Sequence, residues 1–98
     1  MNRKPLAETK NDAWIGDAVL ALFCREWILR ESQTTDGERQ RAMSSNQFLS
    51  NFGNPTEVEA CIGRVYRDEG LAAAFDWIEA KLLPTFSAQE KRKLRQRL

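Results

Sequence analysis

The sequence predicts a compact, all-α bundle of about five helices. Three observations support this fold class: apolar residues recur at helical spacing, no segment alternates apolar and polar residues over the length of a strand, and Gly or Pro separates the apolar segments. The chain has 98 residues, of which 42% are hydrophobic, and this suits one globular domain. We therefore expect a flexible lead-in over residues 1–9 and a single domain over residues 10–98.

The first predicted helix runs from about Asn11 to Glu31. Residues 13–23 are hydrophobic apart from Gly16 and Asp17. A helix that is apolar on most sides normally lies at the centre of a fold. We expect this helix to be central and to carry more apolar surface than one small core can cover.

Four further helices are predicted, each from a start or stop signal. A Thr-to-Glu spacing of three residues precedes the second helix, and a Ser-to-Glu spacing of the same kind opens the fifth. An Asn-Pro pair starts the third helix, a glycine separates it from the fourth, and a proline ends the fourth. The expected ranges are 36–51, 55–68, 71–83 and 87–98.

The composition restricts the chemistry that the chain can perform. It contains no histidine, which excludes Ser-His-Asp and Cys-His catalysis and ordinary zinc sites. Its two cysteines, Cys24 and Cys61, lie in apolar helical segments, and we expect both to be reduced core thiols. Acid–base or metal chemistry must therefore come from carboxylates.

Charge and hydropathy narrow the choice of partners. Lys and Arg number 15 against 14 for Asp and Glu, so the net charge is +1 and phosphate binding would need a local basic patch. No apolar run approaches the roughly 20 residues of a membrane span, and the polar first ten residues lack a secretory signal. We expect no membrane association and a cytoplasmic location.

Two carboxylates attract attention because each lies in an apolar helix beside a small residue. Asp17 follows Gly16, and Glu59 precedes Ala60. A carboxylate on an apolar stripe is costly unless it is paired, hydrogen-bonded or bound to a metal. Two such acids on different helices could share Mg²⁺, which takes oxygen ligands and keeps several waters. The alternative is that each acid faces a gap in the packing or a lysine.

Two segments resemble the catalytic helices of ribonuclease III endonuclease domains. The segment NDAWIGDAVL at residues 11–20 is similar to the family's signature helix, and VEACIGRVYRDEG at residues 58–70 is similar to its second catalytic helix. The resemblance covers about residues 11–85, with the motifs in the family's order. It implies that Asp17 and Glu59 are catalytic residues that bind Mg²⁺ or Mn²⁺.

Three positions depart from the longer enzymes of this family. Lys10, Ala13 and Thr56 stand where those enzymes carry acidic residues. The mini-ribonuclease III group also lacks the two acids on the first helix and the double-stranded RNA-binding domain, so the chain resembles that group in a shorter form. The nearby acids Asp12 and Glu57 lie about 140° and about 200° round their helices and are poor substitutes.

The resemblance implies a metal-dependent endoribonuclease that cleaves double-stranded RNA as a homodimer. Basic residues would contact phosphates, and the uncovered apolar side of the first helix would form the dimer contact. The candidate RNA-binding residues are Arg39, Arg41, Arg64, Arg67, Lys91 and Arg92. The candidate dimer-interface residues are Trp14, Ile15 and Val19.

The sequence leaves two other functions open. One is a non-catalytic ribonuclease III-like module that binds RNA or a ribonucleoprotein, a reading favoured by Lys10, Ala13 and Thr56. The other is a small helical interaction protein that shares only the fold, which does not by itself imply function. The basic C-terminal segment could likewise be a solvated helix face.

Overall fold

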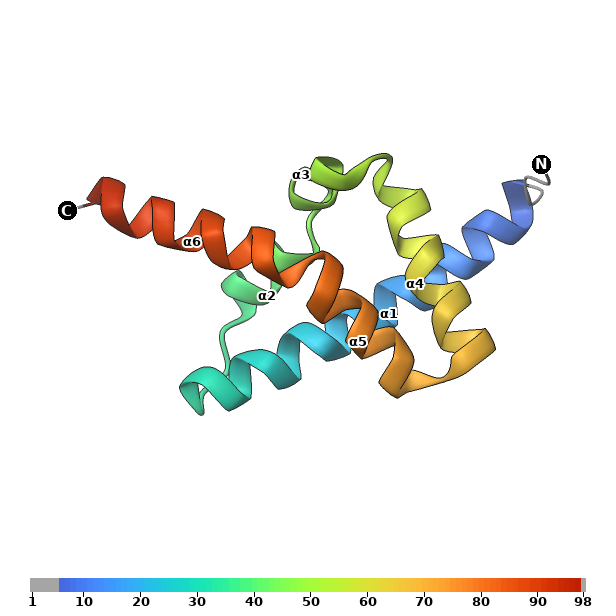
Figure 1. Ribbon diagram of the computed structural model, residues 1–98, viewed down its shortest axis with the longest axis horizontal. Coiled ribbons are helices and arrows are strands. Elements are labelled where there is room, and N and C mark those ends of the chain that lie inside the picture. Colours follow the sequence, from blue (N-terminus) through green and yellow to red (C-terminus); the bar gives the residue numbers. More distant parts are fainter. Residues whose placement is uncertain (1–5, 98) are drawn as a thin grey trace.

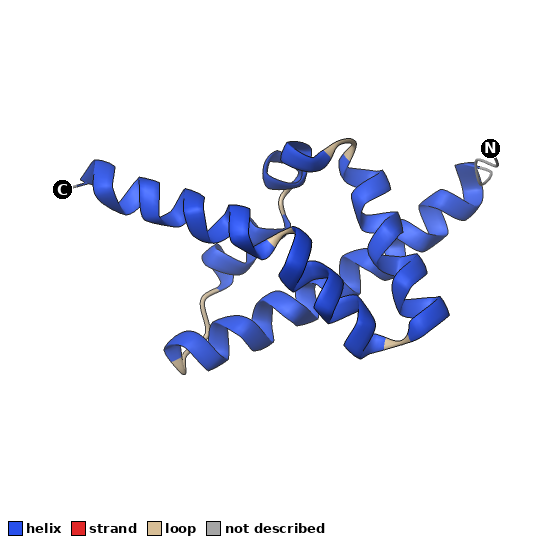
Figure 2. Ribbon diagram, in the orientation of Figure 1, coloured by secondary structure: helices blue, strands red, loops and turns tan. Residues whose placement is uncertain are grey.

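The computed structural model describes residues 6–97, which are helical throughout apart from short connections and include no strand (Figure 2). This confirms the all-α prediction, and five of the helices have eight or more residues. The elements are α1 (Leu6–Ser32), α2 (Gly37–Ser44), α3 (Asn46–Leu49), the 3-10 helix η1 (Ser50–Phe52), α4 (Pro55–Glu69), α5 (Leu71–Lys81) and α6 (Leu83–Arg97).

The long helix α1 is the axis of the molecule, as its apolar sequence predicts. It contacts α2, α4 and α5, and α4 crosses its N-terminal half (Figure 1). Helix α6 runs away from the body to the end of the molecule opposite the start of α1. The molecule is elongated, with extents of 48 × 24 × 20 Å. Within residues 6–97, no helix combines the length and apolar character that a membrane span requires.

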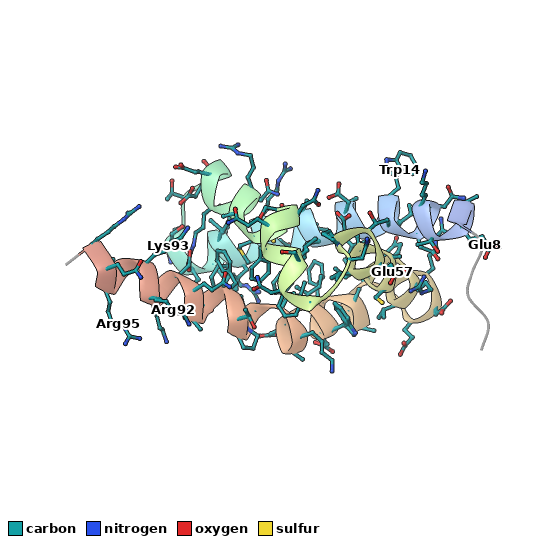
Figure 3. The ribbon with its side chains drawn as sticks, turned by 90° about the horizontal axis from the view of Figure 1, so that it is seen from above. Glu8, Trp14, Glu57, Arg92, Lys93 and Arg95 are labelled. Atoms are coloured by element: carbon teal, nitrogen blue, oxygen red, sulfur yellow. The ribbon has the colours of Figure 1, made fainter. Side chains whose placement is uncertain are left out.

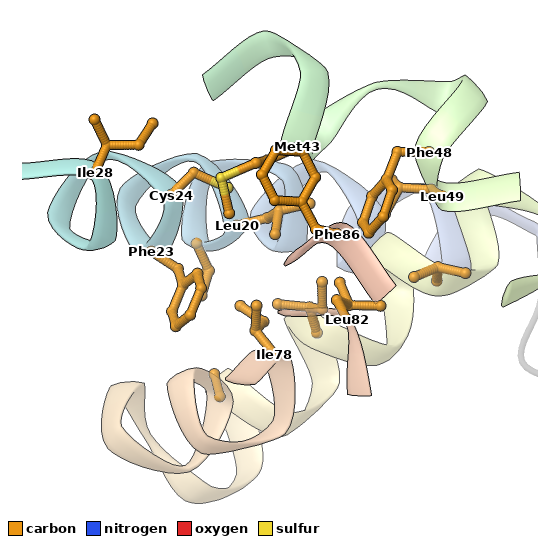
Figure 4. Packing of buried hydrophobic residues seen from close by; sticks show 14 residues of the cluster. Leu20, Phe23, Cys24, Ile28, Met43, Phe48, Leu49, Ile78, Leu82 and Phe86 are labelled. Atoms are coloured by element: carbon orange, nitrogen blue, oxygen red, sulfur yellow. The ribbon is translucent and has the colours of Figure 1, made fainter. Parts of the chain in front are cut away.

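Apolar side chains from all six α-helices meet on one side of α1 (Figure 4). Phe86 of α6 joins this core by edge-on aromatic contacts, with its ring centroid 5.5 Å from that of Phe48 and 6.2 Å from that of Trp27. Such pairs add to the stabilisation from burial alone. The buried apolar cluster consists of Val19, Leu20, Phe23, Cys24, Ile28, Met43, Phe48, Leu49, Val58, Ile62, Ala74, Ile78, Leu82 and Phe86.

The start of α1 lies earlier than predicted. Residues 6–9 of the expected lead-in are helical, and residues 1–5 lie outside the described residues. Ala7 favours a helix, and Glu8 lies in the first turn, where a negative charge interacts favourably with the helix dipole. The polar composition of this segment therefore does not exclude a helix.

The helix predicted over residues 36–51 is broken into α2, α3 and η1. The break is at Ser45, whose backbone is extended and whose hydroxyl accepts a hydrogen bond from the Phe48 amide at 3.0 Å. Serine competes with the helix backbone for hydrogen bonds and is favoured as a cap. The break turns Phe48 and Leu49 into the core, where both are buried.

The boundary between the last two helices is also different from the prediction. Helix α5 ends at Lys81, Leu82 forms a turn, and Pro84 lies in the first turn of α6 instead of ending the preceding helix. Proline is tolerated there because the first helical amides have no partner within the helix. Ser87 is consequently in the interior of α6, and the predicted Ser-to-Glu cap at this point is wrong.

The sequence signals predicted the start of α4 correctly and the start of α2 to within one residue. The Asn54 side chain accepts a hydrogen bond from the Glu57 amide at 3.2 Å, and Pro55 begins α4. Helix α2 is capped one residue later than its spacing predicts, because Asp36 rather than Thr35 accepts the bond from the Arg39 amide.

Candidate metal centre

Helices α1 and α4 cross in direct backbone contact at two glycines. A Cβ atom on Gly16 would lie 1.7 Å from the carbonyl oxygen of Glu59, and one on Gly63 would lie 1.9 Å from that of Asp12. Real Cβ atoms essentially never approach other atoms within 3.0 Å, so only glycine permits this crossing. The crossing brings Asp17, which follows Gly16, beside Glu59.

Asp17 and Glu59 form a pair of carboxyl groups within hydrogen-bonding reach of each other. Asp17 is exposed, whereas Glu59 is half-buried. Burial, the hydrogen bond with Asp17 and the negative charge of Asp17 together raise the pKa of Glu59 to about 7, and burial is the largest of these causes. Glu59 therefore keeps its proton up to about neutral pH, because burial and the neighbouring negative charge both disfavour its ionised form.

We expect the metal-free protein to become less stable as the pH rises, because Glu59 then loses its proton. The pKa of Glu59 is about 7 in the folded chain and near 4.5 when unperturbed, so the folded state binds more protons than the unfolded state between these values. The stability that this proton contributes is present at the acid end of the window and is lost as the pH rises through about 7.

Thermal unfolding in a chelating buffer, measured for the wild type and for Glu59→Gln, isolates this effect. The melting temperature of the wild type should fall relative to the variant between about pH 4.5 and about pH 7. Parallel pH profiles for the two proteins would contradict the raised pKa.

The donor set suits a hard divalent cation because both members offer carboxylate oxygens. Among the described residues, no group of three or more His, Cys, Asp or Glu side chains is placed to hold a metal. The three positions that are acidic in the longer ribonuclease III enzymes add no ligand here: Lys10 and Thr56 are exposed, and Ala13 is buried. An ion at this pair would keep most of its waters.

Asp12 has a structural environment that the sequence did not reveal. It is 3% exposed, and its carboxylate oxygens lie 3.5 Å from Arg64 Nη1 and 3.3 Å from Arg67 Nη1. A buried carboxylate needs such partners. Asp12 lies on a different face of α1 from Asp17, as expected. Its ion pairs with the two arginines depend on the position of α4, and the only nearby sequence feature that hints at this close approach is Gly63.

The two thiols differ. Cys24 is fully buried, and this burial raises the pKa of its thiol to about 12, so it is a neutral core group as predicted. Cys61 is only half-buried, and its sulfur accepts a hydrogen bond from Arg64 Nη2 at 3.5 Å. The prediction of a core position is therefore wrong for Cys61, because its face of α4 turns partly toward solvent.

The six candidate RNA-binding residues lie in two regions, and they differ in whether they form ion pairs within the chain. Arg64 and Arg67 are on α4, where they pair with Asp12. Arg39, on α2, donates to the Glu90 carboxylate at 2.7 and 2.8 Å and to Glu31 at 3.2 Å. The other three are exposed and make no ion pair with any described residue; these are Arg41, Lys91 and Arg92.

The three candidate dimer residues also differ in exposure. Trp14 is 78% exposed and projects from α1 into solvent (Figure 3). Ile15 is half-buried and packs against the core, and Val19 is 6% exposed within it. Trp14 is thus available to a second copy of the chain, whereas Val19 has little surface left to offer.

No protein-family model matches this chain, and no curated protein or solved structure is significantly similar to it.

Proposed function

We propose that this protein is a cytoplasmic endoribonuclease of the ribonuclease III type that hydrolyses phosphodiester bonds in double-stranded RNA with Mg²⁺ or Mn²⁺. The observation that carries the proposal is the meeting of Asp17 and Glu59 across the α1–α4 crossing. They come from the two segments that resemble the catalytic helices of that family.

Asp17 and Glu59 would hold the ion between them. When bound, a divalent ion would lower the pKa of water and stabilise negative charge at phosphorus. Glu59 is fixed by the glycine crossing, because its own carbonyl oxygen packs on Gly16. Asp17 is exposed, so a phosphate group can approach the pair from its side.

The proposal is tested with purified protein, a set of double-stranded RNAs of varied sequence, and buffers that contain Mg²⁺, Mn²⁺ or a chelator. We expect cleavage only with a divalent ion. We also expect either ion to raise the melting temperature of the wild type, because a ligand that binds the folded state stabilises it. The same ion should have little effect on Glu59→Gln.

Intact RNA in every buffer would favour the second candidate, a non-catalytic module that binds RNA or a ribonucleoprotein. The observation behind this alternative is that, among the described residues, Lys10, Ala13 and Thr56 leave two carboxylates at the site. RNA binding without cleavage would then be the expected result.

A homodimer is part of the proposal, with the contact on α1. Trp14, Ala18, Leu22 and Leu29 fall on one face of this helix, and all four are exposed. Arg25 also lies on this face, so the stripe is mainly but not wholly apolar. The stripe borders Asp17, and a second copy on it would place two carboxylate pairs on one assembly. Aromatic residues such as Trp14 are enriched at the centres of interfaces.

We expect Trp14→Glu to give a folded monomer. The side chain is 78% exposed within one chain, so a charge there should not disturb the core but should oppose a second apolar stripe. Sedimentation should change from a dimer to the 11.3 kDa monomer, whereas Leu94→Glu, at an exposed leucine on α6, should remain dimeric. A wild-type protein that is monomeric at micromolar concentration would contradict the dimer and weaken the proposed enzyme, which needs a site for each strand.

A further inference from the structure

The C-terminal part of α6, residues 91–97, projects beyond the body of the molecule (Figure 1). Every residue in this segment, here called the α6 arm, is exposed. The helix has five cations and a single acid, Glu90, whereas the whole chain has a net charge of only +1. The arm is therefore a basic extension on a body that is slightly acidic.

The base of the arm is held firmly in place. Phe86 is buried in the core, and one turn later Glu90 accepts two hydrogen bonds from Arg39 at 2.7 and 2.8 Å. Arg39 also lies 4.4 Å above the ring of Trp27, a distance at which a guanidinium is attracted to the aromatic face. Bidentate pairing of this kind fixes direction as well as distance. The only acid of α6 is thereby occupied within the chain.

One face of the arm presents cations without any acid. Lys91, Arg92 and Arg95 lie within about 100° of one another round the helix, and Lys91 and Arg95 are about 6 Å apart along its axis. The preceding residues on this face, Ser87 and Ala88, are small, and they line one surface groove together with the three cations. Arg92 and Arg95 lie on one side of α6 and Lys93 on the other (Figure 3).

We propose that this face of the α6 arm binds the phosphate backbone of double-stranded RNA; the choice of RNA rests on the proposed function. Arginine and lysine side chains at the surface position a nucleic acid by contacting its phosphates. The chemistry favours a phosphate backbone over a membrane surface, because Leu94 is the only apolar residue of the described arm, whereas a membrane-surface helix needs an apolar face.

The test compares two triple variants with the same change in net charge. One is Lys91→Gln, Arg92→Gln and Arg95→Gln. The matched control replaces three other exposed cations with glutamine, namely Arg25, Arg30 and Lys81. Glutamine preserves helix propensity, and circular dichroism should show that both proteins are folded before binding is compared. Binding of a labelled RNA duplex is measured by fluorescence anisotropy in a chelating buffer, so that cleavage does not contribute.

We expect the α6 triple variant to lose about tenfold or more in affinity and to reduce the slope of log affinity against log salt by about 2 to 3, close to one unit for each phosphate contact. The control triple should bind nearly as well as the wild type. The inference is overturned if both triples lose affinity equally, if the α6 triple binds normally, or if the wild type binds no duplex. It is also overturned if the α6 triple loses only binding to vesicles containing phosphatidylserine.

The two proposals can fail separately. A wild type that cleaves duplex RNA while the α6 triple binds it normally would remove the role of the arm and leave the enzyme in place. A wild type that binds duplex RNA through the arm but cleaves nothing with Mg²⁺ or Mn²⁺ would remove the proposed enzyme and leave the role of the arm in place.

Discussion

Gly16→Ala and Gly63→Ala should each severely destabilise the protein, although alanine is the better helix former. In an ordinary helix interior, this replacement stabilises by roughly 0.8–1 kcal/mol. Here the new methyl group would overlap the backbone of the facing helix, at 1.7 Å for Gly16 and 1.9 Å for Gly63. Backbone atoms cannot rotate away as a side chain can, so α1 and α4 must separate.

We expect each variant to lose about 3 kcal/mol or more, at the upper end of the range for overpacking. Since a domain of this size loses about 4–8 °C for each kcal/mol, the melting temperature should fall by at least about 12 °C or the chain should not fold. Any folded fraction should also lose the pH dependence assigned to Glu59, because that carboxyl would lose its burial at the crossing and move away from Asp17.

Gly37→Ala is the matched control. Gly37 opens α2, and the nearest atom to a new Cβ would be the Arg41 Nη1 at 3.2 Å, the far end of a flexible side chain. This variant should be as stable as the wild type or slightly more so. If Gly16→Ala behaved in the same way, the close crossing of α1 and α4 would be wrong, and with it the geometry of the carboxylate pair.

Asp17→Asn and Glu59→Gln should each abolish cleavage while leaving the fold intact. Each replacement removes a charged oxygen ligand at nearly constant shape. The charge stabilisation that a catalytic ion supplies is worth several kcal/mol, and each 1.36 kcal/mol is a factor of ten in rate. We therefore expect the rate to fall by about a hundredfold to a thousandfold or more in either variant.

Melting temperatures distinguish a variant that has lost only catalysis from one that has lost its structure. Each variant removes one of two neighbouring negative charges, so in metal-free buffer above about pH 7 its melting temperature should equal or exceed that of the wild type. Glu26→Gln on α1 and Asp68→Asn on α4 are matched controls, since both acids are exposed. Full activity in Asp17→Asn or Glu59→Gln would place the catalytic site elsewhere on the molecule.

The helix pattern predicted where helices exist better than where they begin and end. Asn54 and Pro55 are a local start signal, and α4 begins there. Ser45 interrupts a segment whose periodicity looks continuous, and Leu82 places the next break before Pro84, where a break at the proline was expected. Burying Phe48, Leu49 and Phe86 together requires turns at these points. The energy that selects these breaks comes from residues distant in the sequence, which periodicity does not record.

The two carboxylates of the candidate site could be predicted from the sequence, but the long-range ion pairs elsewhere in the fold could not. An acid in an apolar helix is a local anomaly, and this drew attention to both Asp17 and Glu59. The pairing of Arg39 with Glu90, 51 residues away, has no local signal. Its effect is to remove Arg39 from the set of unpaired cations and to orient α6.

The sequence by itself determined the all-α class, the central position of α1 and the two carboxylates, because each of these follows from the pattern within a few helical turns. The tertiary structure alone decided which surfaces are free. Val19 and Trp14 lie five residues apart on one apolar helix, yet the first is buried and the second exposed. The physical reason is that α2, α4 and α5 together cover only part of α1, and α4 crosses it where two glycines 47 residues apart are in direct contact.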